Sequence, residues 1–532
     1  MVPSAVTVDM GPPTPESERD VMLGDLKEDS QPKSAVLHRS LKTTPLQVVS
    51  GNGKYLTFSN GHTILDTTCG AAVACIGYDN KRVKQAMVDQ IDKFSYCNSM
   101  FFSHPVGEEL AAELVRGTGG AMSKAYIMSS GSEAMEAAMK MARQYYMEVS
   151  PQQPKRINFI ARESSYHGTT LGALSMSGHV ARRGLFLDML LPNISRVSAC
   201  NAYRGMSAGQ TVEQYVEQLA DELDRKFQEL GPETVCAFVA EPVVGATIGC
   251  VPAVPGYFKA MKKICDKYGA LLILDEVMSG MGRCGSLHAW QQEDVVPDIQ
   301  TMAKGLGGGY ASISGMMINH RIADALESGT GIFSHGHTYQ GHPVACAAAL
   351  EVQRIIREEN LVENVRNTGA YLENLLHAHL DSHPHVGNIR GRGLFWGIEF
   401  VADKETKEPF PPSANVANAV HLKGLNDLGI SLYPGTGTKD GIVGDHVLLA
   451  PAYTSTSEEI EEIAMKSMSE ELGQTQQETG LVFLSHTNLC EKQRFVSGAR
   501  GTGVLALAEP VSHITSVPDG LDSGPSPPQS TT

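Results

Sequence analysis

Short apolar runs and helical periodicities alternate along the middle of the chain. VCAFVAEP (235–242) and ALLILDEV (270–277) end in acidic residues and are typical of buried parallel strands. Between them, GYFKAMKKICDKYG (256–269) has the apolar spacing of a helix and ends on a glycine stop signal. A further helix is expected over SEAMEAAMKMARQYY (132–146), with Ser132 as its N-cap. This alternation predicts an α/β domain that binds ligands at the carboxyl ends of its strands.

The pattern changes near residue 346. A long helix, AALEVQRIIREEN, is followed there by the mixed segment VGNIRGRGLFWGIEF, which predicts a second, smaller α+β domain. We expect the large domain over 96–345 and the small domain over 35–95 and 346–472. The tails, 1–34 and 473–532, lack sustained apolar periodicity and are expected to be disordered.

Composition narrows the class of protein. The 532 residues are 42% hydrophobic and 19% charged, a globular balance. A net charge of −16 disfavours nucleic acids and anionic membrane surfaces as partners, and no apolar run approaches a membrane span. The ten cysteines are scattered without zinc-type spacing, so no metal site is expected and a reducing compartment is favoured. The acidic N-terminus lacks the features of a secretory or transit peptide, which makes the cytoplasm the expected location.

An aspartate and a lysine in two glycine-rich segments are candidates for catalysis. Asp275 ends an apolar strand in ILDEVMSGMGRCG, where burial favours its neutral form unless a cation such as a protonated pyridine nitrogen lies beside it. Lys304 follows Met302 in TMAKGLGGGY, and desolvation there would make its amine a nucleophile toward carbonyls. The alternatives are a buried ion pair or helix cap for Asp275 and an ordinary surface position for Lys304. The segment between Asp275 and Lys304 is long enough for one crossover connection between parallel strands. Both residues are therefore expected at the same edge of the sheet.

Two further segments suit a phosphorylated aromatic ligand. In YIMSSGSEAMEAAM (126–139) a strand turns directly into a helix, whose free first-turn amides suit a phosphate monoester. An ordinary N-cap explains this segment equally well. In SSYHGTT (164–170), Tyr166 beside a His-Gly turn is positioned to stack on an aromatic cofactor, although a satisfied core tyrosine and histidine are equally plausible.

Together these segments resemble the class III (omega) aminotransferases, which have pyridoxal-phosphate (PLP) fold type I. The resemblance covers about residues 45–472, and its most specific element is DEV-x2-GxGRxG followed by KGLGGG. It implies a large domain with a mostly parallel central sheet sandwiched by helices, plus a smaller α+β domain formed by the N- and C-terminal parts. The other matching segments are SSGSEAMEAAMKMAR, SYHGTT, AEPV and HGHTYQGHPVACAAAL.

The resemblance also implies the roles of individual residues. Lys304 is expected to hold PLP as a Schiff base, Asp275 to pair with the pyridine nitrogen, and Glu241 to be an active-site carboxylate. Thr338 matches a threonine that reaches the phosphate of the neighbouring subunit, which implies a homodimer with shared active sites. The remaining cofactor-binding positions are the phosphate cup, the stacking tyrosine with its histidine, and the residue on the other side of the ring: Ser130, Gly131, Ser132, Tyr166, His167 and Val277.

The implied reaction moves an amino group from an omega-amino acid or primary amine to an oxo acid such as pyruvate or 2-oxoglutarate. It proceeds in ping-pong fashion, with Lys304 moving the proton. An aminomutase or a PLP-dependent decarboxylase of the same fold remains open, because both keep Lys304 and Asp275. A non-catalytic binding protein is disfavoured by the complete motif set. A nucleotide-binding enzyme is disfavoured because no loop has the full fingerprint.

The residues expected to bind the substrate match the family pattern less closely than the cofactor-binding residues do. Tyr433, in SLYPGTGTKDGIVGDHVLLAP, falls where many relatives place an arginine that binds a carboxylate. A substrate carboxylate would then be bound by Arg390, Arg392 or His446. Alternatively, the amine donor has no carboxylate at this position. Alternatively, the two arginines only pair with acids. Ala72 lies in TCGAAVACIGYDN, which matches a pocket-lining segment, and small residues there suggest a roomy cavity or a closely packed helix.

Overall fold

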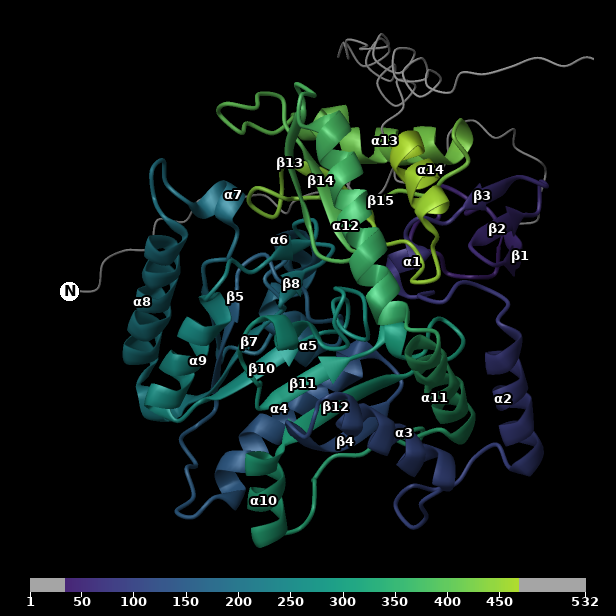
Figure 1. Ribbon diagram of the computed structural model, residues 1–532. Helices are drawn as coiled ribbons and strands as arrows, with labels where there is room; N and C mark the ends of the chain where they lie inside the picture. Colours follow the sequence, from purple (N-terminus) through teal and green to yellow (C-terminus); the bar gives the residue numbers. More distant parts are fainter. Residues whose placement is uncertain (1–33, 468–532) are drawn as a thin grey trace, which may run out of the picture. The chain divides into compact units, whose positions relative to one another are not determined.

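The computed structural model describes residues 34–467 (Figure 1). The tails expected over 1–34 and 473–532 therefore lie, apart from Ser34, outside the described residues. No helix in the described part of the chain is long and apolar enough to cross a membrane.

A seven-stranded sheet forms the centre of the fold. Four neighbouring pairs are parallel (β10 with β7 and β11, and β5 with β7 and β6), whereas β12 runs antiparallel to β11 and β4. The sheet is therefore mostly parallel, as expected. In spatial order its strands are β4 (Met122–Met128), β12 (Ser314–Asn319), β11 (Ile299–Met302), β10 (Leu271–Asp275), β7 (Val235–Ala240), β5 (Asn158–Arg162) and β6 (Ile194–Val197).

Helices cover both faces of this sheet, which confirms the sandwiched arrangement (Figure 1). On one face Val239 and Ile273 pack in an apolar cluster with α4 (Gly131–Glu148). On the other face the alternate residues of the same strands pack against α8 (Val212–Leu230) and α9 (Tyr257–Tyr268). Because β10 is buried on both sides, its sequence is a continuous apolar run rather than an alternating one.

The helix ends show where local sequence signals were sufficient. Helix α9 ends at Tyr268, and Gly269 adopts the left-handed conformation with φ 65°, as its stop signal predicted. The expected N-cap of α4 was wrong. Ser130 caps this helix rather than Ser132, because Ser130 and Glu133 form a reciprocal capping box. Gly131 and Ser132 consequently belong to the first turn.

A smaller part of the fold combines both ends of the described chain. Its antiparallel sheet has the order β13 (Val386–Gly391), β14 (Trp396–Phe400), β16 (Asp445–Leu449) and β15 (Tyr433–Thr436). Leu65 and Val83 from the N-terminal part share one apolar core with Leu372, Ile398 and Ile460. The other elements of this part are β1 (Val48–Asn52), β2 (Tyr55–Phe58), β3 (Thr63–Leu65), α12 (Leu361–Leu380), α13 (Val416–Asn426) and α14 (Ser457–Ser467).

The other helices and short strands connect these parts. They are α1 (Cys69–Ala72), α2 (Lys81–Lys93), α3 (Pro105–Gly117), α5 (Leu171–Met176), α6 (Val180–Arg183), α7 (Ala202–Gly205), α10 (His320–Ser328), α11 (Pro343–Glu358), β8 (Val243–Val244) and β9 (Val251–Pro252). The chain leaves β7, β10 and β11 at one edge of the central sheet, so the residues that follow these strands meet there.

Candidate active site

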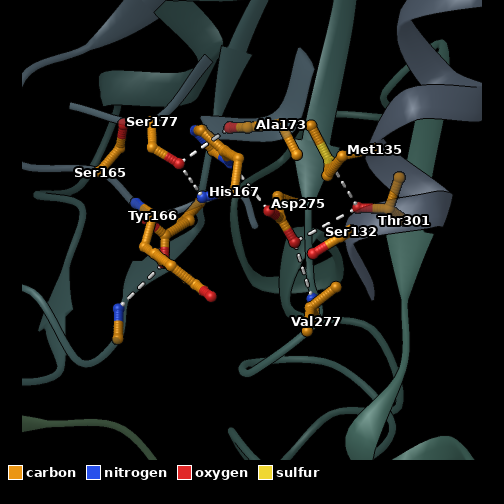
Figure 2. A network of polar contacts seen from close by, with 12 residues as sticks. Ser132, Met135, Ser165, Tyr166, His167, Ala173, Ser177, Asp275, Val277 and Thr301 are labelled. Carbon is orange, nitrogen blue, oxygen red and sulfur yellow. Dashed lines mark hydrogen bonds and ion pairs between the residues drawn. The ribbon is translucent and has the colours of Figure 1, made fainter. Parts of the chain in front are cut away.

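Asp275 is the last residue of β10 and is almost completely buried. Its Oδ2 lies 2.8 Å from Nδ1 of His167, while Oδ1 accepts from the amide of Val277 at 3.0 Å and from the hydroxyl of Thr301 at 3.3 Å (Figure 2). Three hydrogen-bond donors thus surround one carboxylate and fix its orientation. The Nε2 atom of His167 is buried without a hydrogen-bond partner in the described part of the chain.

His167 is itself fixed from its backbone. Its amide donates to the hydroxyl of Ser177 at 2.8 Å, and that hydroxyl donates to the carbonyl of Ala173 at 2.9 Å (Figure 2). With Nδ1 facing the carboxylate of Asp275, the neutral ring donates from Nδ1 and leaves Nε2 as an acceptor. The ring orientation and the orientation of the carboxylate are therefore set together.

Lys304 follows β11 and meets the same edge of the sheet. Its backbone is left-handed, with φ 46°, and its Nζ donates to the carbonyl of Ala71 at 2.9 Å. Burial lowers the pKa of this amine from 10.5 to about 8, against the opposing effect of the negative charges of Asp275 and Glu241. A sizeable fraction of the amine is therefore neutral, and nucleophilic, at mildly alkaline pH.

Glu241 follows β7 and organises the neighbouring loop. One carboxylate oxygen accepts from the amide of Tyr166 at 3.0 Å, and the other accepts from the amide of Gly245 at 3.1 Å. Burial raises the pKa of Glu241, the negative charge of Asp275 raises it further, and the amides of Tyr166 and Gly245 oppose this rise. In the structure Glu241 thus holds the backbone of Tyr166 in place.

The start of α4 packs tightly against the loops that carry Asp275 and Lys304. A Cβ atom at Gly131 would lie 3.1 Å from both methyl groups of Val277 and 3.7 Å from the Cβ of Ala303. The hydroxyl of Ser132 accepts from the amide of Thr169 at 3.0 Å. The amide of Glu133 donates to the hydroxyl of Ser130, whereas the amides of Gly131 and Ser132 have no intrahelical acceptor and suit an anion beside the two candidate catalytic residues.

Arg182 is a cation at this site that sequence reasoning missed. Its guanidinium carbon lies 4.7 Å from the centroid of the Tyr166 ring, and its positive charge contributes to lowering the pKa of Lys304. Arg182 belongs to α6, which packs close to the loop after β15: a Cβ at Gly441 would lie 2.8 Å from Val180. The segment HVARR shortly after SYHGTT was the available signal.

The predicted substrate residues fall into two groups. Ala72 and Tyr433 belong to one apolar cluster, together with Met278. Arg390 instead lies 2.5 Å from Glu399, and Arg392 lies 2.6 Å from Glu293. The structure thus shows both arginines paired with buried acids, as in the alternative interpretation.

His446 and Thr338 have other surroundings. His446 is buried and bonds to the hydroxyl of Thr438 at 2.6 Å. Thr338 is exposed, and the hydroxyl of Tyr96 donates to its carbonyl at 3.1 Å. Among the described residues, Thr338 makes no recorded hydrogen bond to the cluster of Asp275 and Lys304.

Arg283 explains part of the GMGRCG motif. It is completely buried, donates to the carbonyls of Leu394 at 3.0 Å and Pro451 at 2.6 Å, and lies 4.6 Å from the centroid of the Tyr453 ring. The loop expected to approach a ligand therefore also joins the region of the central sheet to the smaller part of the fold.

Comparison with known proteins gives the family. The chain matches the model of the family described as aminotransferase class-III over residues 36–472. It is 70% identical to an aminotransferase of Gibberella zeae, over 81% of this chain and 84% of the relative. It is 34% identical to gamma aminobutyrate transaminase 3, chloroplastic, of Solanum lycopersicum, over 79% of each chain.

Solved structures similar to this chain agree with this family assignment. A thermostable (S)-enantioselective omega-transaminase from Thermomicrobium roseum has a TM-score of 0.76 at 35% identity, with 82% of this chain and 94% of that chain covered. An amine transaminase from an uncultivated Pseudomonas species, in a PLP-bound form, has a TM-score of 0.75 at 30% identity, with 84% and 98% covered. The chain belongs to the class III aminotransferases. It is a transaminase of PLP fold type I.

The lowered pKa of Lys304 leads to a prediction for the cofactor-free protein. We expect the rate of its reaction with PLP to reach half of its maximum near pH 8 rather than near 10.5. Below that midpoint the rate should fall about tenfold for each pH unit, because the neutral fraction of the amine falls in proportion. Absorbance after mixing across a pH series measures this rate. The Lys304→Ala protein is the control, and a midpoint close to that of an ordinary lysine would contradict the assignment.

Proposed function

We propose that the chain binds PLP at this site and transfers an amino group from an omega-amino acid or primary amine to an oxo acid such as pyruvate or 2-oxoglutarate, in ping-pong fashion. One observation carries the proposal: the amine of Lys304, with a pKa of about 8, lies at the same sheet edge as the buried carboxylate of Asp275. Family membership supports the reaction class.

The residues at the site fit the three chemical parts of PLP. The first-turn amides of Gly131 and Ser132 suit its phosphate, and the carboxylate of Asp275 suits a protonated ring nitrogen. The amine of Lys304 suits its aldehyde. Tyr166 and Val277 are the proposed neighbours of the two ring faces, and Val277 supports this through its close packing at Gly131.

When bound, PLP supplies an electron sink for the electron pair left on the substrate carbon after loss of a proton. In its neutral form, Nζ of Lys304 would take the proton from that carbon and would deliver it to the carbon of PLP that carried the aldehyde. The carboxylate of Asp275 would stabilise a positive charge on the ring nitrogen. His167 and Thr301 hold this carboxylate in place through Oδ2 and Oδ1. Glu241 acts through the backbone of Tyr166.

We also propose a homodimer in which Thr338 serves the neighbouring active site. Thr338 lies beside exposed aromatic side chains: the hydroxyl of Tyr96 donates to its carbonyl, and the rings of Tyr96 and Tyr339 lie 5.8 Å apart. Tyr96 is 43% exposed and Tyr339 is 61% exposed. A second copy covering this surface would bring Thr338 toward the phosphate site of its partner. The cytoplasm is the proposed location, since the described cysteines are all unpaired thiols.

We further propose that Arg182 receives the carboxylate of the oxo acid. The carboxylate of an oxo acid needs a cationic partner, and the positive charge of Arg182 contributes to lowering the pKa of Lys304. The guanidinium of Arg182 contacts the Tyr166 ring, and Val180 of the same helix packs near Gly441 in the loop after β15.

The first test is the visible absorbance of the purified protein with PLP. We expect a band that an amine substrate bleaches and that pyruvate or 2-oxoglutarate restores, because each half-reaction converts one cofactor form into the other. The Lys304→Ala variant should lack the amine-dependent cycle. A protein that takes up no PLP would contradict the enzyme proposal and favour a binding role.

The same experiment separates a transaminase from its alternatives. Without an oxo acid, a transaminase consumes at most one amine per active site. Continued consumption without an acceptor would instead indicate an aminomutase or a decarboxylase. Release of carbon dioxide would distinguish the decarboxylase.

Replacing Arg182 by glutamine tests the carboxylate proposal. We expect KM for the oxo acid to rise by roughly tenfold to a hundredfold, since a charged hydrogen bond contributes about 1.5–3 kcal/mol. KM for an amine donor without a carboxylate should change little. Arg183→Gln, one residue further along α6, is the matched control. Equal changes for the charged and uncharged substrates would contradict the role of Arg182.

A further inference from the structure

Asp66, between β3 and α1, is a buried carboxylate outside the site described above. Its Oδ1 accepts from the amide and hydroxyl of Thr68 at 3.0 and 2.8 Å and from the hydroxyl of Ser431 at 2.7 Å. Its Oδ2 accepts from the amide of Gly70 at 2.8 Å and from the hydroxyl of Tyr78 at 2.6 Å. Every contact is a donor, so the carboxylate is well satisfied.

The two oxygens hold different parts of the protein. Oδ1 ties the N-terminal part to Ser431, two residues before Tyr433. Oδ2 holds the turn at Cys69–Ala72, in which Cys69, Gly70 and Ala72 have φ values of 50°, 71° and 62°. Non-glycine residues in this left-handed region are strained, so such a turn persists only where surrounding contacts fix it.

This turn reaches the candidate catalytic lysine. The carbonyl of Ala71, between Gly70 and the strained residue Ala72, is the acceptor for Nζ of Lys304 at 2.9 Å. A lysine side chain has four flexible carbon–carbon bonds, and a fixed acceptor confines its amine to one position. The position of that acceptor depends on the turn that Asp66 holds through Gly70.

We propose that Asp66 is a positioning residue of the transaminase. Through Oδ2 it fixes the turn at Gly70 and Ala71, so that the Ala71 carbonyl receives Nζ of Lys304 whenever this amine is not bonded to the cofactor. The amine then stays beside the substrate carbon while it moves the proton. This inference rests on the proposed function.

Substitutions can separate the two oxygens of Asp66. Asp66→Asn leaves one acceptor oxygen for the five contacts that two oxygens now accept, so the carboxylate can no longer hold the turn and Ser431 together. Tyr78→Phe removes only one of the two contacts to Oδ2. Ser431→Ala is the matched control, because it removes a contact to Oδ1 and leaves the turn at Gly70 held.

The first readout is capture of PLP by the cofactor-free protein at a pH above the titration of Lys304. We expect Asp66→Asn to slow capture several-fold and Tyr78→Phe to slow it less, because the amine is no longer confined. Ser431→Ala should stay close to the unaltered protein. The Lys304→Ala protein shows which part of the signal belongs to this lysine.

The second readout is the single-turnover reaction of the loaded protein with an amine deuterated at the reacting carbon. In Asp66→Asn the rate should fall on the order of tenfold with little change in the half-saturating amine concentration, and the isotope effect should rise. A general loss of stability would not raise the isotope effect. If Asp66→Asn does not fold, Tyr78→Phe carries the same test in the same direction.

The outcomes of this experiment are distinct. The positioning role is overturned if Asp66→Asn and Ser431→Ala slow capture and turnover alike, in step with their melting temperatures and with an unchanged isotope effect. In that case the unaltered protein still captures PLP and reacts, so the proposed function stands. Failure of the unaltered protein to capture PLP at Lys304 overturns the proposed function and, with it, the positioning role.

Discussion

The active site depends on one constraint: opposite charges must be kept close together at the carboxyl edge of a sheet that is otherwise apolar. Burial alone favours the neutral amine of Lys304. Hydrogen bonds from His167, Val277 and Thr301 fix the position of the Asp275 carboxylate beside it. The negative charges of Asp275 and Glu241 in turn limit the fall in the pKa of Lys304, so that it stops at about 8. An amine in that range can both react with a carbonyl and exchange protons.

The smaller part of the fold completes this edge. Arg283, in the loop that follows Asp275, donates to two backbone carbonyls beyond the central sheet, and Asp66 ties the turn beneath Lys304 to Ser431. The Ala71 carbonyl, in a turn that the N- and C-terminal parts of the chain hold together, therefore fixes the amine of Lys304. The neighbouring strands β10 and β11 fix the backbone positions of Asp275 and Lys304. The reactivity of Lys304 therefore depends on both the central sheet and the smaller part of the fold.

Much of this arrangement could be predicted from the sequence. The continuous apolar run before Asp275 identifies a strand buried on both faces, and its end identifies the ligand edge. The N-cap of α4 was misplaced because two serines flank Gly131, and only the partnership with Glu133 selects Ser130. The contacts of Arg182, Asp66 and Arg390 join residues far apart in the sequence, so no local pattern distinguishes a site residue from a paired structural one.

The most direct test of the central claim is to reduce the PLP-loaded protein with borohydride and to locate the modified peptide by mass spectrometry. Reduction fixes the cofactor to the nitrogen that holds it. Our interpretation predicts a single phosphopyridoxyl group on Lys304, absent from the Lys304→Ala protein. A group on another lysine, or equal labelling of the Lys304→Ala protein, would contradict the assignment of Lys304 and the site built around it.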